Sequence, residues 1–427
     1  MDIVSQVSEC FDELVKNSKK AAKEFIVKRL EILDREIYLK ADRKRFELIR
    51  IDERTILTTA GIITYKRRYY YDDVKEDYVY LLDNQLQIPK HIRMSNELII
   101  RIMDLASIMT YKEVGEHLSE EFTLSKFTVW NVIKNTNIEL INPPKIDIGE
   151  NMVHLQIDEK YVNINPHKKR GKKHKSKNKK RYYTATIFAG KEAFGGKGKN
   201  RLLNKTYISS ASLREMRKRI NRTLREEYHQ TAKDEIYLSG DLATYIQNMK
   251  ECITACKATY VPDKFHVIRD LRKIIGGEFA ENWLYDAEKL ATIVIRLRES
   301  DSPNAPKLTK LILKNPGIFE TYKSKDYLGC SQEGQNSHVY AVRFGKYANR
   351  FLKETIEKLS LIREAVAVGA SIRIAHKNRE LPEKEYIGEI AYDFSEKQKW
   401  DIDLTDMKYE TQKMFRNIIY GGYNGID

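Results

Sequence analysis

The chain has 427 residues, of which 41% are hydrophobic and 32% are charged. This length and composition predict a globular protein with two or three domains. No apolar run approaches the about 20 residues that a membrane-spanning helix needs, and the N-terminus lacks the pattern of a secretory signal. Four scattered cysteines (Cys10, Cys252, Cys256 and Cys330) do not form a disulfide framework, so we expect a cytoplasmic protein without a membrane partner. Cys252 and Cys256 have no matching second pair, so no structural zinc is predicted.

The net charge of +15 is concentrated in the run HKKRGKKHKSKNKKR, residues 167–181. A run this dense repels itself and predicts a loop or arm. A solvated loop or a localisation-like tag is one interpretation. We favour contact with the phosphates of nucleic acid, where each neutralised phosphate releases counterions. The candidate DNA-binding residues are Lys168, Lys169, Arg170, Lys172, Lys173, Lys175, Lys177, Lys179, Lys180 and Arg181.

The first half of the chain alternates between helical and β patterns. Residues 8–48 carry apolar side chains at helical spacing, and 1–50 is predicted to be an N-terminal helical region. Two β-rich runs around Ala60-Gly61 predict a hairpin within residues 54–82, and helix returns after Pro89. Residues 51–142 are therefore assigned to a β-hairpin followed by helices.

Residues 109–135 predict two short helices joined at 122–125. Ser125 is a suitable N-cap for the second helix. This outline is typical of a helix-turn-helix, whose second helix enters the major groove of DNA, but it fits a plain α-hairpin equally well. The predicted inward side chains are Val114, Leu118 and Phe122 on the first helix, and Phe127, Trp130 or Val129, and Ile133 on the second.

After a predicted boundary at Asn142-Pro143-Pro144, strands and helices follow in the order βββαβαβ. The predicted strands begin near residues 153, 181, 205, 235 and 258, with a long helix over 212–229. This order predicts an α/β (mixed α+β) domain at 150–266, with a mixed β-sheet flanked by helices. Residues 267–328 predict an all-helical insertion, and 329–427 a C-terminal helical region.

Three carboxylates are candidates for chemistry. Asp158 and Asp241 each end a predicted strand, and each lies on the face opposite the apolar side chains. Gly240 would allow close approach by another group. Carboxylates at the carboxyl ends of adjacent strands gather where open sheets bind ligands. They suit Mg²⁺ (or Mn²⁺), and two ions roughly 4 Å apart support in-line displacement at phosphorus. Glu333, in the polar stretch CSQEGQNSH, is the candidate third ligand.

Each acid also has a purely structural interpretation. Asp241 precedes helix-forming residues and could be an N-cap. Asp158 could form a strand-end salt bridge, and Glu333 could be a first-turn acid that interacts with the helix dipole. Taken one at a time, these structural roles are the more common ones.

Four segments in order, HLQIDEKYV, YLSGDLATYI, VPDKFHVIRDL and CSQEGQNSHVYAVRF, resemble the DDE transposases of bacterial insertion sequences, and most of all the ISLre family. The resemblance covers about residues 50–370. It implies an RNase H-like catalytic domain in which Asp158, Asp241 and Glu333 are the catalytic and metal-binding triad. Asp263 and His266 resemble a D-x-x-H signature that supports the site, and His338 would line it. His266 could equally pack against its own helix.

The resemblance implies a nucleoid-associated DNA transposase that binds double-stranded DNA, both element ends and target, as a homo-oligomer. It would hydrolyse a phosphodiester at the element end and transfer the freed strand to target DNA. The basic run, the hairpin and the helices near 110–135 would contact DNA. A recruited or degenerate DNA-binding protein, or a nuclease without strand transfer, are the alternatives.

Overall fold

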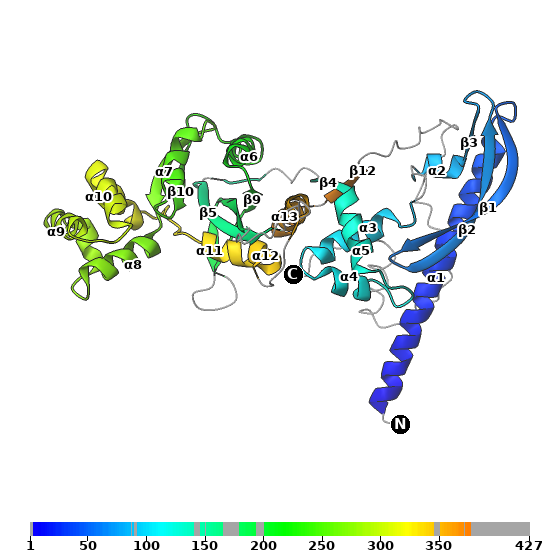
Figure 1. Cartoon of the computed structure of the whole chain (residues 1–427), viewed down its shortest axis with the longest axis horizontal. Helices are drawn as coiled ribbons and strands as arrows, with labels where there is room; N and C mark the ends of the chain where they lie inside the picture. Colours follow the sequence, from blue (N-terminus) through cyan, green and yellow to red (C-terminus); the bar gives the residue numbers. More distant parts are fainter. Residues whose placement is uncertain are drawn as a thin grey trace, which may run out of the picture.

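The computed structural model describes residues 3–86, 88, 92–140, 146–149, 151–164, 179–193, 200–345, 351–370 and 372–376. The elements form an elongated arrangement (Figure 1). α1 and strands β1–β3 lie at one end, α9 and α10 at the other, and the main sheet lies between them. In the described part of the chain, no helix combines the length and apolar character that crossing a bilayer requires.

A long helix and a twisted hairpin make up the N-terminal end. α1 (Ile3–Lys40) packs on β2 (Gly61–Asp72), which pairs antiparallel with β1 (Phe46–Thr58). β3 (Asp77–Val79) extends this sheet, and α2 (Leu81–Gln85) closes its small core. The predicted hairpin is therefore present, although β1 begins at Phe46, within the segment assigned to the N-terminal helical region. Gly61 follows the turn at a φ of +116°, a conformation that favours glycine.

Three helices follow: α3 (Asn96–Ala106), α4 (Tyr111–His117) and α5 (Lys126–Asn135). Thr110 and Glu113 form a capping box on α4, and the Ser125 side chain caps α5 by accepting from the Thr128 N–H, as predicted. A Cβ at Gly115 would lie 1.9 Å from the Leu124 carbonyl oxygen, so only glycine allows the backbone before α5 to approach α4 this closely.

The inward faces of α4 and α5 were predicted only in part. Val114, Val129 and Ile133 are buried as expected. Phe127 is 66% exposed, so its predicted inward position is wrong. The first helix ends at His117, which leaves Leu118 and Phe122 half-buried in a longer connection than predicted.

The main sheet has five strands in the order β11-β10-β5-β6-β9. β5 (His154–Asn163), β6 (Lys179–Phe188) and β9 (Thr206–Ser210) pair antiparallel, whereas β10 (Glu235–Gly240) runs parallel to both β5 and β11 (Lys257–Pro262). A short hairpin, β7 (Lys191–Ala193) and β8 (Asn200–Leu202), lies between β6 and β9 in the chain. The predicted mixed sheet is confirmed.

Helices cover both faces of this sheet. The face that carries Leu155 and Ile157 packs on α6 (Leu213–Glu226), α7 (Thr244–Gln247) and the 3₁₀ turn Asn248–Cys252. On the other face, Tyr182 and Tyr207 pack in a second core with α3–α5 and the C-terminal helices. The predicted boundary at 142–144 lies outside the described residues.

The predicted all-helical insertion comprises α8 (Lys264–Ile275), α9 (Ala287–Arg298), α10 (Ala305–Lys314) and the 3₁₀ segments Glu281–Tyr285 and Pro316–Lys323. α11 (Gln332–Gln335), a π-helical turn (Asn336–Ala341), α12 (Val342–Phe344) and α13 (Lys353–Val368) follow. The C-terminal region was predicted to be helical. This is only partly correct, because β12 (Ile372–His376) pairs antiparallel with β4 (Thr136–Leu140).

Candidate functional site

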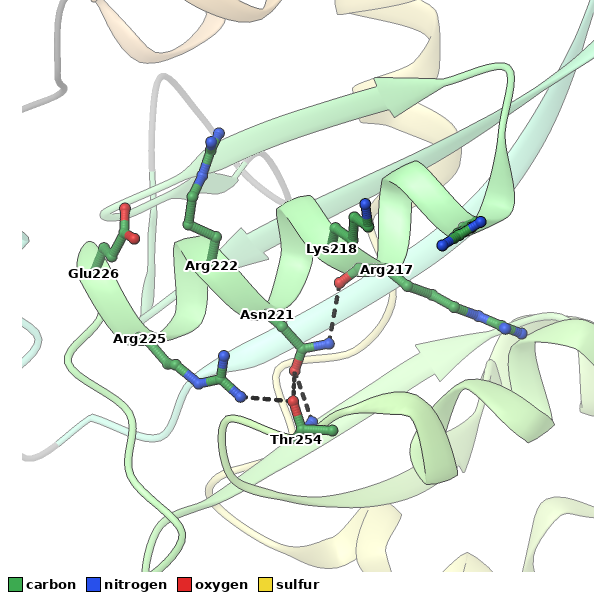
Figure 2. Close-up of a pocket in the computed structure, with 8 residues that line it drawn as sticks. Arg217, Lys218, Asn221, Arg222, Arg225, Glu226 and Thr254 are labelled. Carbon is green, nitrogen blue, oxygen red and sulfur yellow. Dashed lines mark hydrogen bonds between the residues drawn. The ribbon is translucent and has the colours of Figure 1, made fainter.

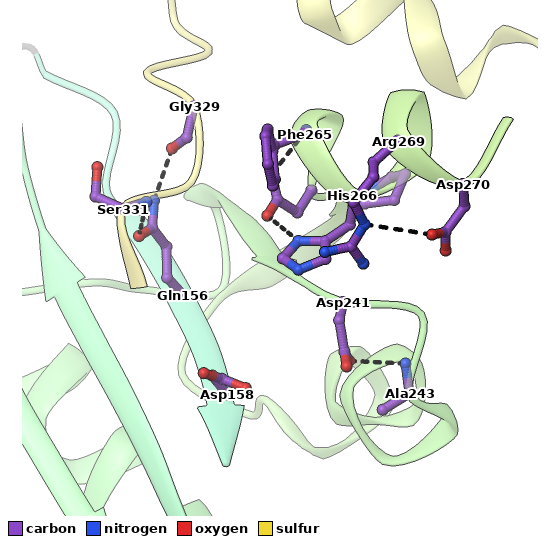
Figure 3. Close-up of polar contacts among 12 residues, drawn as sticks. Gln156, Asp158, Asp241, Ala243, Phe265, His266, Arg269, Asp270, Gly329 and Ser331 are labelled. Atoms are coloured by element: carbon purple, nitrogen blue, oxygen red, sulfur yellow. Dashed lines mark hydrogen bonds and ion pairs between the residues drawn. The ribbon is translucent and has the colours of Figure 1, made fainter. Parts of the chain in front are cut away.

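The candidate site lies where β10 ends beside the middle of β5. Asp158 was predicted to end its strand, which is wrong, because β5 continues to Asn163 in its antiparallel pairing with β6. The parallel register pairs Gly240 with Ile157, so Asp241 and Asp158 are the next residues on neighbouring strands. Paired residues of parallel strands point to the same face, and this face also carries Gln156. A Cβ at Gly240 would lie 2.6 Å from the Ile157 carbonyl oxygen, so glycine permits this close strand approach. Figure 3 shows Asp158 on β5 and Asp241 just after the end of β10.

Asp158 is partly exposed and surrounded by polar contacts. The Asn336 Nδ2 donates to its Oδ2 at 2.6 Å, and Thr184 Oγ1 donates to its backbone carbonyl at 3.1 Å. Lys160 Nζ lies 4.0 Å from Oδ2, at the limit of an ion pair, so a strand-end salt bridge accounts for little of its environment. Burial raises the pKa of Asp158, and the negative charge of Asp241 adds to this rise.

Asp241 is exposed and ends β10 in a tight turn. Its Oδ1 accepts from the Ala243 N–H at 2.9 Å, while Tyr260 OH donates to its carbonyl oxygen at 2.8 Å. The N-cap of α7 is Ala243, so Asp241 is not the helix cap that a structural interpretation suggested. Its carboxylate is fixed by this turn (Figure 3), and its charge acts on Asp158.

Gln156 holds the segment before α11 against the sheet. This fully buried side chain donates from Nε2 to the Gly329 carbonyl at 2.7 Å and accepts at Oε1 from the Ser331 N–H at 2.8 Å (Figure 3). Both polar ends of the amide therefore bind the backbone of one segment, which fixes the start of α11 relative to β5.

A buried polar network continues from α11 into the sheet. Gln332 Nε2 donates to Thr184 Oγ1 at 3.2 Å and to Asn336 Oδ1 at 3.3 Å, and Tyr207 OH donates to the same Asn336 oxygen at 2.8 Å. Gln332 and Asn336 are four residues apart and point to the same side. Sequence reasoning missed both residues, although their four-residue spacing inside CSQEGQNSH was a usable signal.

Glu333 itself is exposed at the beginning of α11. Across the described ranges, no three His, Cys, Asp or Glu side chains form a group that could hold a metal ion. The structure thus brings Asp158 and Asp241 together and does not add Glu333 to them. Two adjacent carboxylates fit one Mg²⁺, which takes one or two carboxylates together with phosphate oxygens and water. The two-ion site stays a prediction.

The supporting residues form a local pair. Asp263 caps α8 by accepting from the Phe265 N–H at 3.0 Å, and its Oδ2 lies 2.5 Å from His266 Nδ1. This hydrogen bond raises the pKa of His266, with a smaller contribution from the charge of Asp241. This contact fixes the His266 ring, and the predicted supporting role of the pair stays a prediction. His338 is exposed, and only its carbonyl is engaged among the described contacts, by Arg363 Nη2 at 2.9 Å.

The basic run is described only at its end. Lys179, Lys180 and Arg181 belong to β6 and not to a loop. Arg181 donates from Nε to Tyr161 OH at 3.1 Å and lies 3.5 Å from a Glu159 oxygen, so part of its role is structural. The other predicted DNA-binding residues, Lys168, Lys169, Arg170, Lys172, Lys173, Lys175 and Lys177, lie outside the described residues.

The sequence matches one family over residues 4–379, described as "Uncharacterised protein family (UPF0236)". The chain belongs to the UPF0236 family. Two UPF0236 proteins of Caldanaerobacter subterraneus subsp. tengcongensis are each 25% identical to it over 437 aligned positions. These alignments cover 98% of this chain and 87% and 88% of the relatives. The name of the first relative joins eleven designations from that single strain.

Among solved structures, the Drosophila P element transposase strand transfer complex is similar over 67% of this chain and 83% of that chain, at 13% identity and a TM-score of 0.27. A similarity of this size does not establish a shared fold. The UPF0236 protein is thus placed in its family by sequence, and the chemistry of its site has to be argued from its own residues.

Proposed function

We propose that this UPF0236 protein is a DNA transposase of the DDE type, which cuts and joins phosphodiesters with the help of a divalent cation. The observation that supports the proposal is that Asp158 and Asp241 directly follow the last registered pair, Ile157 and Gly240, of two adjacent parallel strands. Open sheets bind ligands at this edge, and paired carboxylates are what phosphoryl transfer with a metal requires.

The sheet supports an RNase H-like domain. Three antiparallel strands are followed by two parallel ones, and the first strand, β5, is central in the order β11-β10-β5-β6-β9. This is the strand arrangement of RNase H-like folds, in which the first acid lies on the central strand and the second on its parallel neighbour. Asp158 and Asp241 occupy those positions.

Glu333 is proposed as the third acid. It lies three residues before Asn336, which contacts Asp158, and residues three apart on a helix are neighbours. The clamp made by Gln156 holds this part of the chain next to β5. In this proposal the Glu333 carboxylate joins the two aspartates when DNA and the cation are present.

Each group of the chain has a defined role in this proposal. Asp158 and Asp241 would hold the cation, which supplies Lewis-acid activation of the attacking oxygen when bound. Asn336 orients the Asp158 carboxylate, and Gly240 keeps the two strands close enough for the acids to act together. Homo-oligomerisation and recognition of element ends by α4 and α5 belong to the same proposal.

The relatives supply a second support. Eleven designations for one relative within one strain are what eleven gene copies of the same protein would produce. Such repetition is expected of a mobile element and is not expected of a single-copy regulator. This observation favours a transposase over a recruited DNA-binding protein.

The test is cleavage and strand transfer in vitro, with the DNA that flanks the gene and Mg²⁺ present. Asp158→Asn is expected to abolish cleavage while DNA binding stays nearly intact. Asp301→Asn, an exposed acid in the helical insertion, serves as the matched control and should retain activity. Equal loss of binding and cleavage in Asp158→Asn, or no cleavage by the unsubstituted protein, would contradict the catalytic role and favour a non-catalytic DNA-binding protein.

A further inference from the structure

The outward side of α6 carries an unusual concentration of positive charge. Arg214, Lys218 and Arg222 are exposed and follow one another at intervals of four residues. Arg217 and Arg225 lie on the adjacent stripe, eight residues apart. Four residues of helix rise about 6 Å, so these side chains form a row of cations over about 16 Å. We call these five residues the α6 basic surface.

Acidic neighbours offset these cations only in part: burial raises the pKa of Glu227, and the charge of Arg222 acts on this carboxyl to oppose the rise. Within the described ranges, none of the five lies within an ion-pair distance of a carboxylate. Arg219, on another side of the same helix, shows the contrast: it pairs with the buried Glu364 of α13 and is structural. The Arg217 Nε is buried and has no hydrogen-bond partner among the described residues. The α6 basic surface therefore retains its positive charge.

The surface is also preformed. A depression of about 460 Å³ is lined by the five cations, Asn221, Glu226 and Thr254, so it contains a single acid (Figure 2). Asn221 fixes its floor: Oδ1 accepts from the Thr254 N–H at 2.6 Å, and Nδ2 donates to the Cys252 carbonyl at 2.9 Å. Arg225 Nη2 donates to Thr254 Oγ1 at 2.6 Å, which orients that guanidinium.

This surface is separate from the Asp158 site. The buried side of α6 packs on the sheet face that carries Leu155 and Ile157. Gln156 and Asp158 point to the other face, where α11 is held. A ligand on the α6 basic surface therefore approaches the domain from the side of the sheet opposite α11.

We propose that the α6 basic surface binds the phosphate backbone of duplex DNA without reading its sequence. A row of about 16 Å matches about five nucleotides of one strand at 3.4 Å each. Among the described residues, no aromatic side chain lines the depression, so bases have nothing to stack on and single strands are not favoured. The choice of DNA as the polyanion rests on the proposed function, whereas the charge and shape of the surface do not.

The experiment measures binding without cleavage. Fluorescence anisotropy with 30-base-pair duplexes of unrelated sequences, in EDTA and at 50 to 200 mM salt, gives affinity and salt dependence. The variant Arg214→Gln/Lys218→Gln/Arg222→Gln removes three phosphate contacts, which lowers the salt slope by about 2.7. Over that fourfold salt range, the unsubstituted protein should lose about 40-fold more affinity than the variant. Lys218→Gln alone should lower the slope by about 0.9 and guards against a folding defect.

The matched control is Lys307→Gln/Lys310→Gln/Lys314→Gln on α10, which removes the same charge from another exposed helix face. It should keep the original slope. An equal drop in the control, or an unchanged slope in the α6 variants, would overturn the proposal. Loss of binding to anionic phospholipid vesicles, with duplex binding unchanged, would also overturn it and indicate a membrane surface instead. Because no metal is present, failure here is distinguishable from failure of the catalytic proposal.

Discussion

The clamp between Gln156 and the segment before α11 yields a sharp prediction. Gln156→Met keeps an unbranched side chain of similar length but removes both hydrogen bonds. The Gly329 carbonyl and the Ser331 N–H would each lose their partner. An unsatisfied buried group costs about 1–3 kcal/mol. Because Gly329 and Ser331 are half-buried and water can reach them in part, we expect the lower part of this range, about 2–3 kcal/mol in total.

The assay is amide hydrogen exchange, which reports local opening. A local loss of about 2 kcal/mol corresponds to about 30-fold faster exchange at Ser331 and its neighbours in α11. The Gln156 side chain does not bond to strands β10 and β11, so their amide hydrogens should exchange at the same rate as in the unsubstituted protein. Because the same clamp positions Glu333, cleavage should fall while DNA binding is retained.

Thr186→Val is the matched control, because Thr186 is fully buried on the neighbouring strand and its hydroxyl has no partner among the described residues. Its removal should leave exchange in residues 329–336 unchanged. If Gln156→Met leaves exchange there at the original rate, the clamp does not hold α11 and the positioning argument for Glu333 fails.

Two further predictions concern the sheet. Gly240→Ala places a Cβ 2.6 Å from the Ile157 carbonyl and should lower the free energy of unfolding by about 1–3 kcal/mol in urea titration, whereas Gly277→Ala enters open space and should not. Burial lowers the pKa of His154 to about 4. Because the unfolded ring takes up its proton near pH 6.5, His154 stabilises the fold above that pH, and about 2 kcal/mol is lost between pH 7 and pH 5. His154→Phe should remove this part of the pH dependence, and an unchanged difference between unfolding at pH 7 and pH 5 would refute the assignment.

The sequence predicts the sheet well because alternation along a strand is a local property. Leu155 and Ile157 are buried in the main core, and Asp158 lies on the other face, as the alternation required. Adjacency of Asp158 and Asp241 followed from the assignment of both acids to strands of the same sheet, although only Asp241 directly follows the end of its strand. Local pattern and topology were sufficient for these two residues.

Features that depend on distant contacts were not predictable in this way. Gln156 and Gly329 are 173 residues apart, and nothing near either one marks the pair. β4 and β12 pair although they lie far apart in the sequence. Each is five residues long, which is too short for a periodic hydrophobic pattern to be recognised. Phe127 was assigned to the inner face of α5 because it is apolar, but the buried pair Val129 and Ile133 sets the phase of this helix and leaves Phe127 in solvent.

The polar face of β5 links these observations, because its side chains change role along the strand. His154 is buried, kept neutral, and stacked on Phe188 with ring centroids 5.0 Å apart. Gln156, also buried, uses its whole amide to hold α11. Asp158 is next and is partly exposed, with a carboxylate whose charge is disfavoured by burial and by Asp241. Packing thus buries the His154 ring and satisfies Gln156 internally, and it leaves Asp158 at the rim with a negative charge that Asn336 and Lys160 offset only in part. A cation bound between Asp158 and Asp241 would relieve that charge, which is the physical reason to look for phosphoryl-transfer chemistry where β10 ends beside β5.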